Sequence, residues 1–252
     1  MESVAAAAVP VWLPSDGCEP SETEKESRVL ASFSTLLMNR SQSVRLLVLT
    51  CLLALASGPA RAASDHPVIL IVGDSISAGF GVPVQQGYAT LLEQQLQEHM
   101  AGIQVVNASV SGDTTQGGVA RLPQLLEQHH PDLLLIELGG NDGLRGTPLK
   151  LIRQNIERMI RMAEERGTMV MLLGMQIPPN YGQRYTKGFA DIYPQLAEQY
   201  DTLLVPFLLE GVATNPELMQ GDGIHPTAEA QPILQQLVMD ELQLWLELHQ
   251  GE

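Results

Sequence analysis

The residues that could carry chemistry are a serine, a histidine and an aspartate in glycine-rich stretches. Ser75 follows Gly73-Asp74 at the end of an apolar run, and the glycine lets the backbone turn so that the Ser75 hydroxyl faces a crevice. Asp222 lies three residues before His225, so one turn of chain can bring its carboxylate to the ring nitrogen that faces away from Ser75. These residue types predict nucleophilic catalysis, in which histidine removes the serine proton and aspartate fixes the imidazole tautomer.

Such chemistry also needs hydrogen-bond donors for the negative charge that develops on the substrate oxygen. The candidates are the N–H of Ser75, the N–H of Gly112, which no side chain shields, and the side-chain amide of Asn141. Each candidate also has a structural interpretation, as a helix-capping serine, a loop glycine and a turn asparagine. Asp222 and His225 could likewise form a helix-capping turn with a surface histidine.

Pro226 suits the first position of a helix, which would fix His225 at a helix start. The other histidines after residue 62 lie at the start of that region or beside helices, and we expect them on the solvated surface: His66, His99, His129, His130 and His249. Their spacing is not that of a metal site, and no other ligand cluster appears. We therefore expect no metal and no cofactor.

The elements that must position these residues alternate between strand-like and helix-like segments, which is typical of an α/β fold with a parallel sheet. The run Val68–Val72 has no polar break, as in a strand buried on both faces. Ligand sites in such sheets lie beyond the carboxyl ends of the strands, which is where Ser75 falls. The expected strands are 68–72, 103–106, 133–138, 168–173 and 203–207. The expected helices are 86–100, 118–129, 149–166, 189–200 and 227–249, and a long loop is expected at 174–188.

The first part of the chain has a different composition. Residues 1–37 mix an alanine run, prolines and a charged patch without apolar periodicity, and we expect them to be disordered or an artefact upstream of a start at Met38. Arg40 and Arg45 then precede an apolar run at 46–56, which is too short to span a bilayer. This order of charge and apolarity is typical of a secretory leader.

The stretch Ala60-Arg61-Ala62 supplies the small residues of a cleavage site. We therefore expect a signal peptide at 38–62 and a periplasmic or secreted protein without a stable membrane anchor; an uncleaved anchor is the alternative. The remaining chain, 63–252, has no internal repeat or linker and is expected to form one domain. Both cysteines, Cys18 and Cys51, precede the cleavage site, so we expect neither a disulfide nor a thiol nucleophile in the mature chain.

The charge balance argues against one class of partner. The chain has 14 Lys and Arg against 29 Asp and Glu, and no basic run stands out. Binding to a phosphate backbone requires clustered positive charge, so we expect no nucleic-acid partner.

The candidate residues occur in four ordered blocks that resemble those of the SGNH (GDSL) hydrolase family: Gly73-Asp74-Ser75, Gly112, Gly140-Asn141-Asp142 and Asp222-x-x-His225. The resemblance covers essentially all of the chain after the leader. It implies a three-layer α/β/α sandwich with a flavodoxin-like sheet of five parallel strands. It also implies that Ser75 is the nucleophile, His225 the base and Asp222 its partner. The implied oxyanion hole consists of Ser75, Gly112 and Asn141.

The resemblance further implies an acyl-binding region. Residues 143–148 match a mobile loop that closes over the acyl chain in the family, and residues 176–182 match a region that lines the acyl site. The implied substrate-binding residues are Gly143, Leu144, Arg145, Ile177, Pro178 and Tyr181. The implied activity is hydrolysis of acyl esters and thioesters, such as aryl esters, acyl-CoA and lysophospholipids, by an exported monomer without a cofactor.

Three other functions are compatible with parts of this pattern. A flavodoxin-like nucleotide-binding module would use the same sheet, but residues 73–79 fit neither the P-loop nor the dinucleotide pattern. An α/β-hydrolase would carry a Gly-x-Ser-x-Gly elbow, which does not occur. A carbohydrate or short-chain acetylesterase of the same family stays open, since only its substrates would distinguish it.

Overall fold

The computed structural model describes residues 66–250, so the predicted extension (1–37) and signal peptide (38–62) lie outside the described residues. The β-strands are β1 (Val68–Gly73), β2 (Gln104–Asn107), β3 (Leu133–Glu137), β4 (Met169–Leu173) and β5 (Leu203–Val205). The α-helices are α2 (Tyr88–His99), α3 (Thr115–His129), α4 (Gly140–Leu144), α5 (Leu149–Glu164), α6 (Gln183–Ala190), α7 (Ile192–Tyr200) and α8 (Gln231–Gln250). Short 3-10 helices are η1 (Val84–Gln86), η2 (Pro179–Tyr181) and η3 (Pro216–Leu218).

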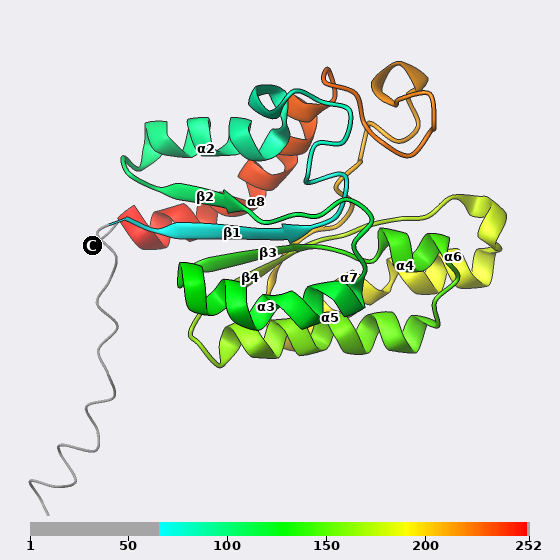
Figure 1. Cartoon of the computed structure of the whole chain (residues 1–252), viewed down its shortest axis with the longest axis horizontal. Helices are drawn as coiled ribbons and strands as arrows, with labels where there is room; N and C mark the ends of the chain where they lie inside the picture. Colours follow the sequence, from blue (N-terminus) through cyan, green and yellow to red (C-terminus); the bar gives the residue numbers. More distant parts are fainter. Residues whose placement is uncertain (1–65, 251–252) are drawn as a thin grey trace, which may run out of the picture. The chain divides into compact units, whose positions relative to one another are not determined.

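The five strands form one parallel sheet in the order β2-β1-β3-β4-β5. Helices α2 and α8 cover one face, and α3, α5 and α7 cover the other (Figure 1). The predicted three-layer α/β/α sandwich is therefore confirmed. The strand order reverses between β1 and β3, and in open parallel sheets a ligand crevice forms outside the carboxyl ends at such a point. The segments that follow β1 and β3 carry Ser75 and Asn141.

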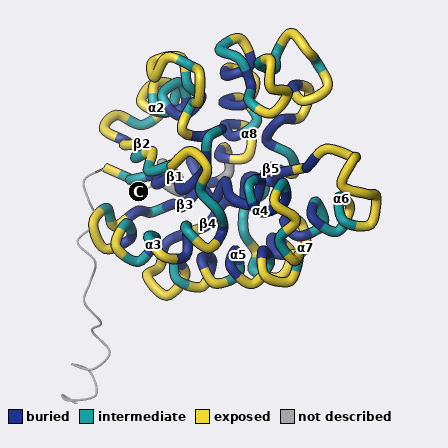
Figure 2. The backbone as a smooth tube through the Cα atoms, turned by 45° about the vertical axis from the view of Figure 1, so that its right-hand side comes forward, coloured by how far each residue is buried: buried dark blue, intermediate teal, exposed yellow. Residues whose placement is uncertain are grey.

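The central strands are buried because helices cover both faces of the sheet. Ile69, Leu70, Ile71 and Val72 of β1 have no exposed surface, as the unbroken apolar run predicted. Figure 2 shows the inner strands as buried and the outward turns and loops as exposed. The sheet is thus a rigid base for the loops at its carboxyl edge.

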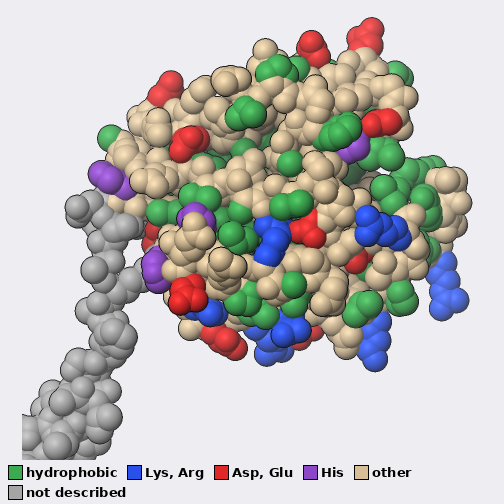
Figure 3. Space-filling model, in the orientation of Figure 1, with side chains coloured by type: hydrophobic (Ala, Val, Ile, Leu, Met, Phe, Trp, Pro, Cys, Tyr) green, Lys and Arg blue, Asp and Glu red, His purple; other side chains and the backbone are tan. Residues whose placement is uncertain are grey.

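Helix α5 shows why the helical layers form. Its side chains Ile152, Ile156, Met159, Ile160 and Ala163 recur every three or four residues, and all are fully buried. This spacing places them on one face of the helix, which packs towards the sheet while the opposite face stays polar. In the space-filling view, charged side chains are scattered over the helical layers, whereas hydrophobic ones gather at the end of the molecule where the strands finish (Figure 3).

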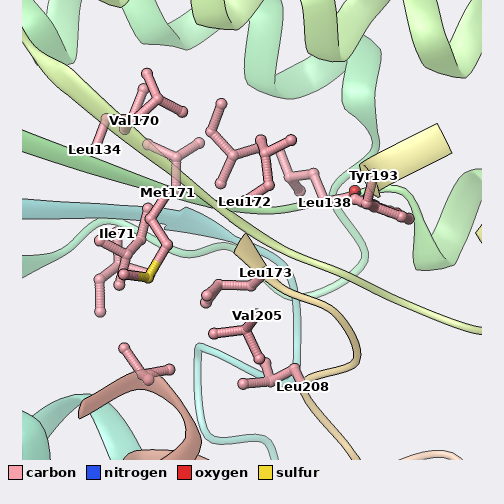
Figure 4. Close-up of a cluster of buried hydrophobic side chains, with 14 of the residues drawn as sticks. Ile71, Leu134, Leu138, Val170, Met171, Leu172, Leu173, Tyr193, Val205 and Leu208 are labelled. Carbon is pink, nitrogen blue, oxygen red and sulfur yellow. Dashed lines mark hydrogen bonds between the residues drawn. The ribbon is translucent and has the colours of Figure 1, made fainter. Parts of the chain in front are cut away.

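Buried side chains pack on both faces of the sheet. In Figure 4, Leu134 of β3 lies on the same face as Tyr193 of α7, whereas Met171 of β4 and Val205 of β5 lie on the opposite face. The Tyr193 hydroxyl donates a hydrogen bond to the backbone carbonyl of Leu138 over 3.0 Å. This bond attaches α7 to the segment that leaves β3.

The predicted single helix at 189–200 is wrong. Helix α6 ends at Ala190 and α7 begins at Ile192, and α6 occupies part of the predicted loop 174–188. The reason is Pro194, which has no N–H to donate and would clash with the carbonyl four residues earlier in a continuous helix. It is tolerated in the first turn of α7, where its missing N–H leaves no bond unmade.

Helix α3 begins at Thr115 rather than at the predicted Gly118. The Thr114 side chain caps it by accepting a hydrogen bond from the N–H of Gly117 over 3.3 Å. The helix needs a glycine at position 118, because a Cβ there would lie 2.4 Å from the Leu138 side chain. The other predicted elements are present with ends shifted by up to four residues. Within residues 66–250, no helix combines the length and apolarity needed to cross a membrane.

Candidate active site

The structure brings Ser75, His225 and Asp222 into one line of contacts. Ser75 lies in the turn after β1, and its Oγ is 2.8 Å from Nε2 of His225. On the other side of the ring, Nδ1 of His225 is 2.7 Å from Oδ2 of Asp222. The two ring nitrogens therefore face a hydroxyl and a carboxylate, which is the arrangement that a serine nucleophile, a base and its orienting acid require.

The local chain holds the Asp222 carboxylate in place. Its Oδ1 accepts hydrogen bonds from the N–H groups of Ile224 (2.9 Å) and His225 (3.0 Å). The hydrogen bond from the His225 ring, followed by those from the two backbone groups, lowers the pKa of Asp222 to about 2. An ionised carboxylate therefore faces the histidine at all physiological pH values.

The expectation that Pro226 starts a helix is wrong. Helix α8 begins only at Gln231, and Pro226 instead forms an isolated antiparallel bridge with Met219. The N–H of Gln220 donates to the carbonyl of His225 over 2.7 Å. His225 thus lies in a narrow loop that closes on itself, because residues on both sides of it pair with each other rather than continue into α8.

The turn that carries Ser75 rests on a buried carboxyl group. The sheet register pairs Gly73 with Glu137, and Oε2 of Glu137 accepts hydrogen bonds from the N–H of Asp74 (3.0 Å), the N–H of Ser77 (3.2 Å) and the hydroxyl of Ser77 (2.7 Å). A Cβ at position 73 would lie 2.6 Å from the same oxygen, so glycine is required there. Glu137 is fully buried, and this burial raises its pKa well above the ordinary value of 4.5. The sequence patterns did not single out Glu137.

A second buried carboxyl group, that of Asp74, links the turn to Asn141. Oδ1 of Asp74 accepts from the N–H of Ile76 over 3.1 Å, and Oδ2 accepts from the Asn141 amide over 2.9 Å. Burial raises the pKa of Asp74 to about 6 although both hydrogen bonds oppose the shift. The orientation of the Asn141 amide is therefore coupled to the residue that precedes Ser75.

The three candidate oxyanion donors line the same cavity. Within residues 66–250, the N–H groups of Ser75 and Gly112 donate no hydrogen bond to another group of the chain. Gly112 has φ +79°, which only glycine adopts readily, and a Cβ there would meet open space. The Asn141 amide carries two hydrogens and uses one on Asp74, so the other is available. The geometry is suited to a negatively charged oxygen beside Ser75.

The cavity at this site has a volume of about 650 Å³. Of the six expected substrate-binding residues, Leu144, Ile177 and Pro178 line it. The other three do not line it but contact residues that do. Arg145 donates to the carbonyl of Gly112 over 3.2 Å, and Tyr181 donates to that of Leu144 over 2.9 Å.

Gly143 also packs closely against a residue of the cavity lining, Ile177. A Cβ at this position would lie 2.7 Å from Cγ2 of Ile177 and 3.0 Å from the Phe189 ring, so only glycine lets the chain pass so closely behind the lining. Much of the apolar lining comes from residues that the sequence patterns did not single out: Phe80, Met175, Phe207, Leu209, Met219 and Ile224. For Phe207, Leu209, Met219 and Ile224 the signal was only the apolar character of the chain between β5 and His225.

The residues of the site offer no metal-binding cluster. Within the described part of the chain, no group of three or more His, Cys, Asp or Glu side chains could hold a metal ion. The charged or titratable side chains that line the cavity are Asp74 and His225, and the rest of the lining is apolar or uncharged.

Comparisons with known proteins find similar sequences over most of the described chain. The model of the GDSL-like lipase/acylhydrolase family matches residues 71–232, a range that includes Ser75, Gly112, Asn141 and His225. An arylesterase from Vibrio mimicus is 49% identical over 199 residues, which are 79% of this chain and 98% of that protein. Thioesterase 1/protease 1/lysophospholipase L1 from Escherichia coli strain K12 is 43% identical over 182 residues, which are 72% of this chain and 85% of that protein.

A solved structure has the same fold. The crystal structure of TesA superposes with a TM-score of 0.68 at 49% sequence identity. The superposition covers 70% of this chain and 98% of that chain. Nearly the whole of that protein therefore has a counterpart here.

Proposed function

Because the chain belongs to the GDSL-like lipase/acylhydrolase family and is an ester hydrolase, we propose that it cleaves acyl esters and thioesters through an acyl intermediate on Ser75. The observation that supports this mechanism best is the continuous line of contacts from Ser75 through His225 to Asp222. The N–H groups of Ser75 and Gly112 support it independently, since within residues 66–250 they donate no hydrogen bond to another group of the chain.

In the proposed first half-reaction, Nε2 of His225 takes the proton of Ser75 as Oγ attacks the carbonyl carbon of the substrate. The negative charge that forms on the carbonyl oxygen is stabilised by the N–H of Ser75, the N–H of Gly112 and the amide of Asn141. The tetrahedral intermediate collapses, and His225 gives its proton to the departing alcohol or thiol. Asp222 stabilises the imidazolium throughout.

In the second half-reaction a water molecule replaces the alcohol or thiol. His225 removes a proton from the water as it attacks the acyl carbon, and the same donors stabilise the second tetrahedral intermediate. Collapse of this intermediate returns the proton to Ser75 Oγ and releases the carboxylic acid. The steps need no cofactor, because the alcohol or thiol leaves with the proton that Ser75 gave up and a proton from the water restores the Ser75 hydroxyl.

The cavity supports a substrate with an apolar acyl chain. Its volume of about 650 Å³ and its apolar walls, formed in part by Phe207 and Leu209, suit a hydrocarbon chain better than a sugar. Because parts of the wall come from loops, we propose activity on a broad range of medium to long chains. The names of the two relatives, an arylesterase and a thioesterase/lysophospholipase, support both ester and thioester substrates.

The test is a panel of nitrophenyl esters of increasing chain length, run beside acyl-CoA and lysophospholipid. We expect turnover to extend to medium and long chains and to be lost in Ser75→Ala. Turnover of acetyl esters alone would contradict the chain-length proposal and favour an acetylesterase. Full activity of Ser75→Ala would contradict the mechanism.

We also propose that the enzyme is exported as a single domain, residues 63–252, after cleavage of the leader at 38–62. This proposal rests on the charged start, the apolar run and the small residues at the end of the leader. We further propose that the mature protein is a monomer, for which size-exclusion chromatography with light scattering is the direct test.

A further inference from the structure

The two loops that carry the proposed nucleophile and base come from opposite ends of the described chain. We call residues 74–82 the nucleophile loop and residues 218–227 the histidine loop. Within residues 66–250, two hydrogen bonds join these loops: the Ser75–His225 contact, and a bond of 2.7 Å from Nε2 of Gln220 to the carbonyl of Phe80. We propose that Gln220 is a positioning residue that holds the histidine loop in the place that proton transfer from Ser75 requires.

The side chain of Gln220 divides its two amide hydrogens between the loops. One is donated to Phe80 of the nucleophile loop, and the other to the carbonyl of Pro226 over 2.9 Å. The backbone N–H of Gln220 donates to the carbonyl of His225 over 2.7 Å, and its own carbonyl accepts from Gly223 over 2.9 Å. Gln220 thus bonds to Gly223, His225 and Pro226 of its own loop. It also bonds to Phe80 of the opposite loop.

The contact on the nucleophile loop leads directly to Ser75. The N–H of Phe80 donates to the carbonyl of Ser75 over 3.0 Å, so the backbone of Phe80 is tied to that of Ser75. The Phe80 ring lies 4.5 Å from the His225 ring, tilted by 37°. Gly81 leaves room for the amide, because a Cβ there would lie 2.4 Å from Oε1 of Gln220. The amide therefore connects the two loops next to the reacting groups.

The Ser75–His225 contact needs such support. Loops are more mobile than the elements they join, and one neutral hydrogen bond adds little net stability in a partly exposed site. Proton transfer, by contrast, is sensitive to position, since a displacement of about 1 Å costs roughly a hundredfold in rate. A second attachment at Gln220 restricts the loop without occupying the substrate cavity, whose lining does not include Gln220.

The experiment uses two substitutions on the full-length chain. Gln220→Glu keeps the shape of the side chain but replaces the two donated hydrogens by an acceptor, and Gln220→Leu removes all polar contacts of the side chain. Gln235→Leu is the matched control, because Gln235 donates to Gln95 between α8 and α2, away from both loops. For each variant, kcat and KM on a nitrophenyl ester, the rate of fluorophosphonate labelling at Ser75 and the melting temperature are measured.

We expect both Gln220 variants to lose about tenfold to a hundredfold in kcat and in labelling rate, with KM within about threefold of wild type. The Gln235→Leu control should keep kcat and lower only the melting temperature. The inference is overturned if kcat of Gln220→Glu stays within about threefold of wild type, if the loss appears in KM alone, or if the control loses as much. If Gln220→Leu does not fold, Gln220→Glu decides.

The inference rests on the proposed function, and the labelling separates the two. If the wild type is labelled at Ser75 and both Gln220 variants keep its kcat and labelling rate, the role of Gln220 is overturned and the proposed function stands. Labelling and turnover that persist in Ser75→Ala overturn the proposed function, and the role of Gln220 with it.

Discussion

The side-chain amide of Asn141 donates a hydrogen bond of 2.9 Å to the buried carboxyl group of Asp74, the residue directly before Ser75. Since Asp74 also accepts from the N–H of Ile76, the same carboxyl group organises the nucleophile loop and directs the amide. The candidate oxyanion donor and the candidate nucleophile are therefore held relative to each other by one side chain, although they follow different strands.

The first prediction concerns Asn141. If its amide stabilises the oxyanion, Asn141→Ala should lower kcat by roughly a hundredfold to a thousandfold, with a smaller change in KM, because the charge appears only in the transition state. Steady-state kinetics and the melting temperature are both measured. Asn155→Ala is the control: its buried amide donates to Thr115 over 3.0 Å, so we expect lower stability with turnover preserved. Near-normal turnover in Asn141→Ala would remove Asn141 from the site.

The second prediction concerns the nucleophile. A fluorophosphonate should label Ser75 and no other serine, because Ser75 is the serine that contacts the His225 ring. Mass spectrometry of the labelled peptide identifies the site. Ser75→Ala should abolish labelling and leave the fold intact. Ser77→Ala is the matched control from the same turn: it loses its bond to Glu137 and should be less stable, but it should still be labelled at Ser75.

The third prediction concerns the pH dependence of stability. Burial raises the pKa of Asp74 from 3.8 to about 6, so the folded chain binds this proton more tightly than the unfolded chain. Between these two pH values the folded state carries the larger share of the proton, and stability must fall as pH rises. Glu137 acts in the same direction because its pKa is also raised. Asp222 acts in the opposite direction only between about pH 2 and 3.8.

Asp74→Asn should therefore weaken the decline in melting temperature between pH 4 and 6, because the amide does not titrate. Calorimetry across this range measures the slope for wild type and variant. A slope that is identical in wild type and Asp74→Asn would contradict the raised pKa of Asp74 in the folded protein.

The fourth prediction concerns export. The exported protein should begin at Ala63, because Ala60-Arg61-Ala62 supplies the small residues that a signal peptidase requires. Intact-mass measurement of the exported fraction gives the N-terminus. Ala60→Leu should block cleavage, and Ala63→Ser should not. An N-terminus before Met38 in that fraction would contradict both the leader and the proposed start.

Local patterns in the sequence were sufficient to predict several of the elements that carry the candidate catalytic residues. The unbroken apolar run identified β1, and the glycine after it placed Ser75 at a strand end. The spacing of Asp222 and His225 predicted a contact that the structure contains, because three residues of chain are enough to close it. Gly112 was a candidate donor because no side chain shields its N–H, and the family resemblance implied the same role. The break between α6 and α7 is equally local, since Pro194 alone excludes a continuous helix.

Tertiary structure alone decided how these pieces meet. Ser75 and His225 are 150 positions apart, and no local pattern relates them. The burial of Glu137 under the Ser75 turn follows from its register opposite Gly73, and the cavity walls follow from the path of the chain after β5. The physical reason is that strand order, register and loop packing are relations between distant segments, whereas hydrophobic periodicity and turn residues report only on neighbours a few positions away.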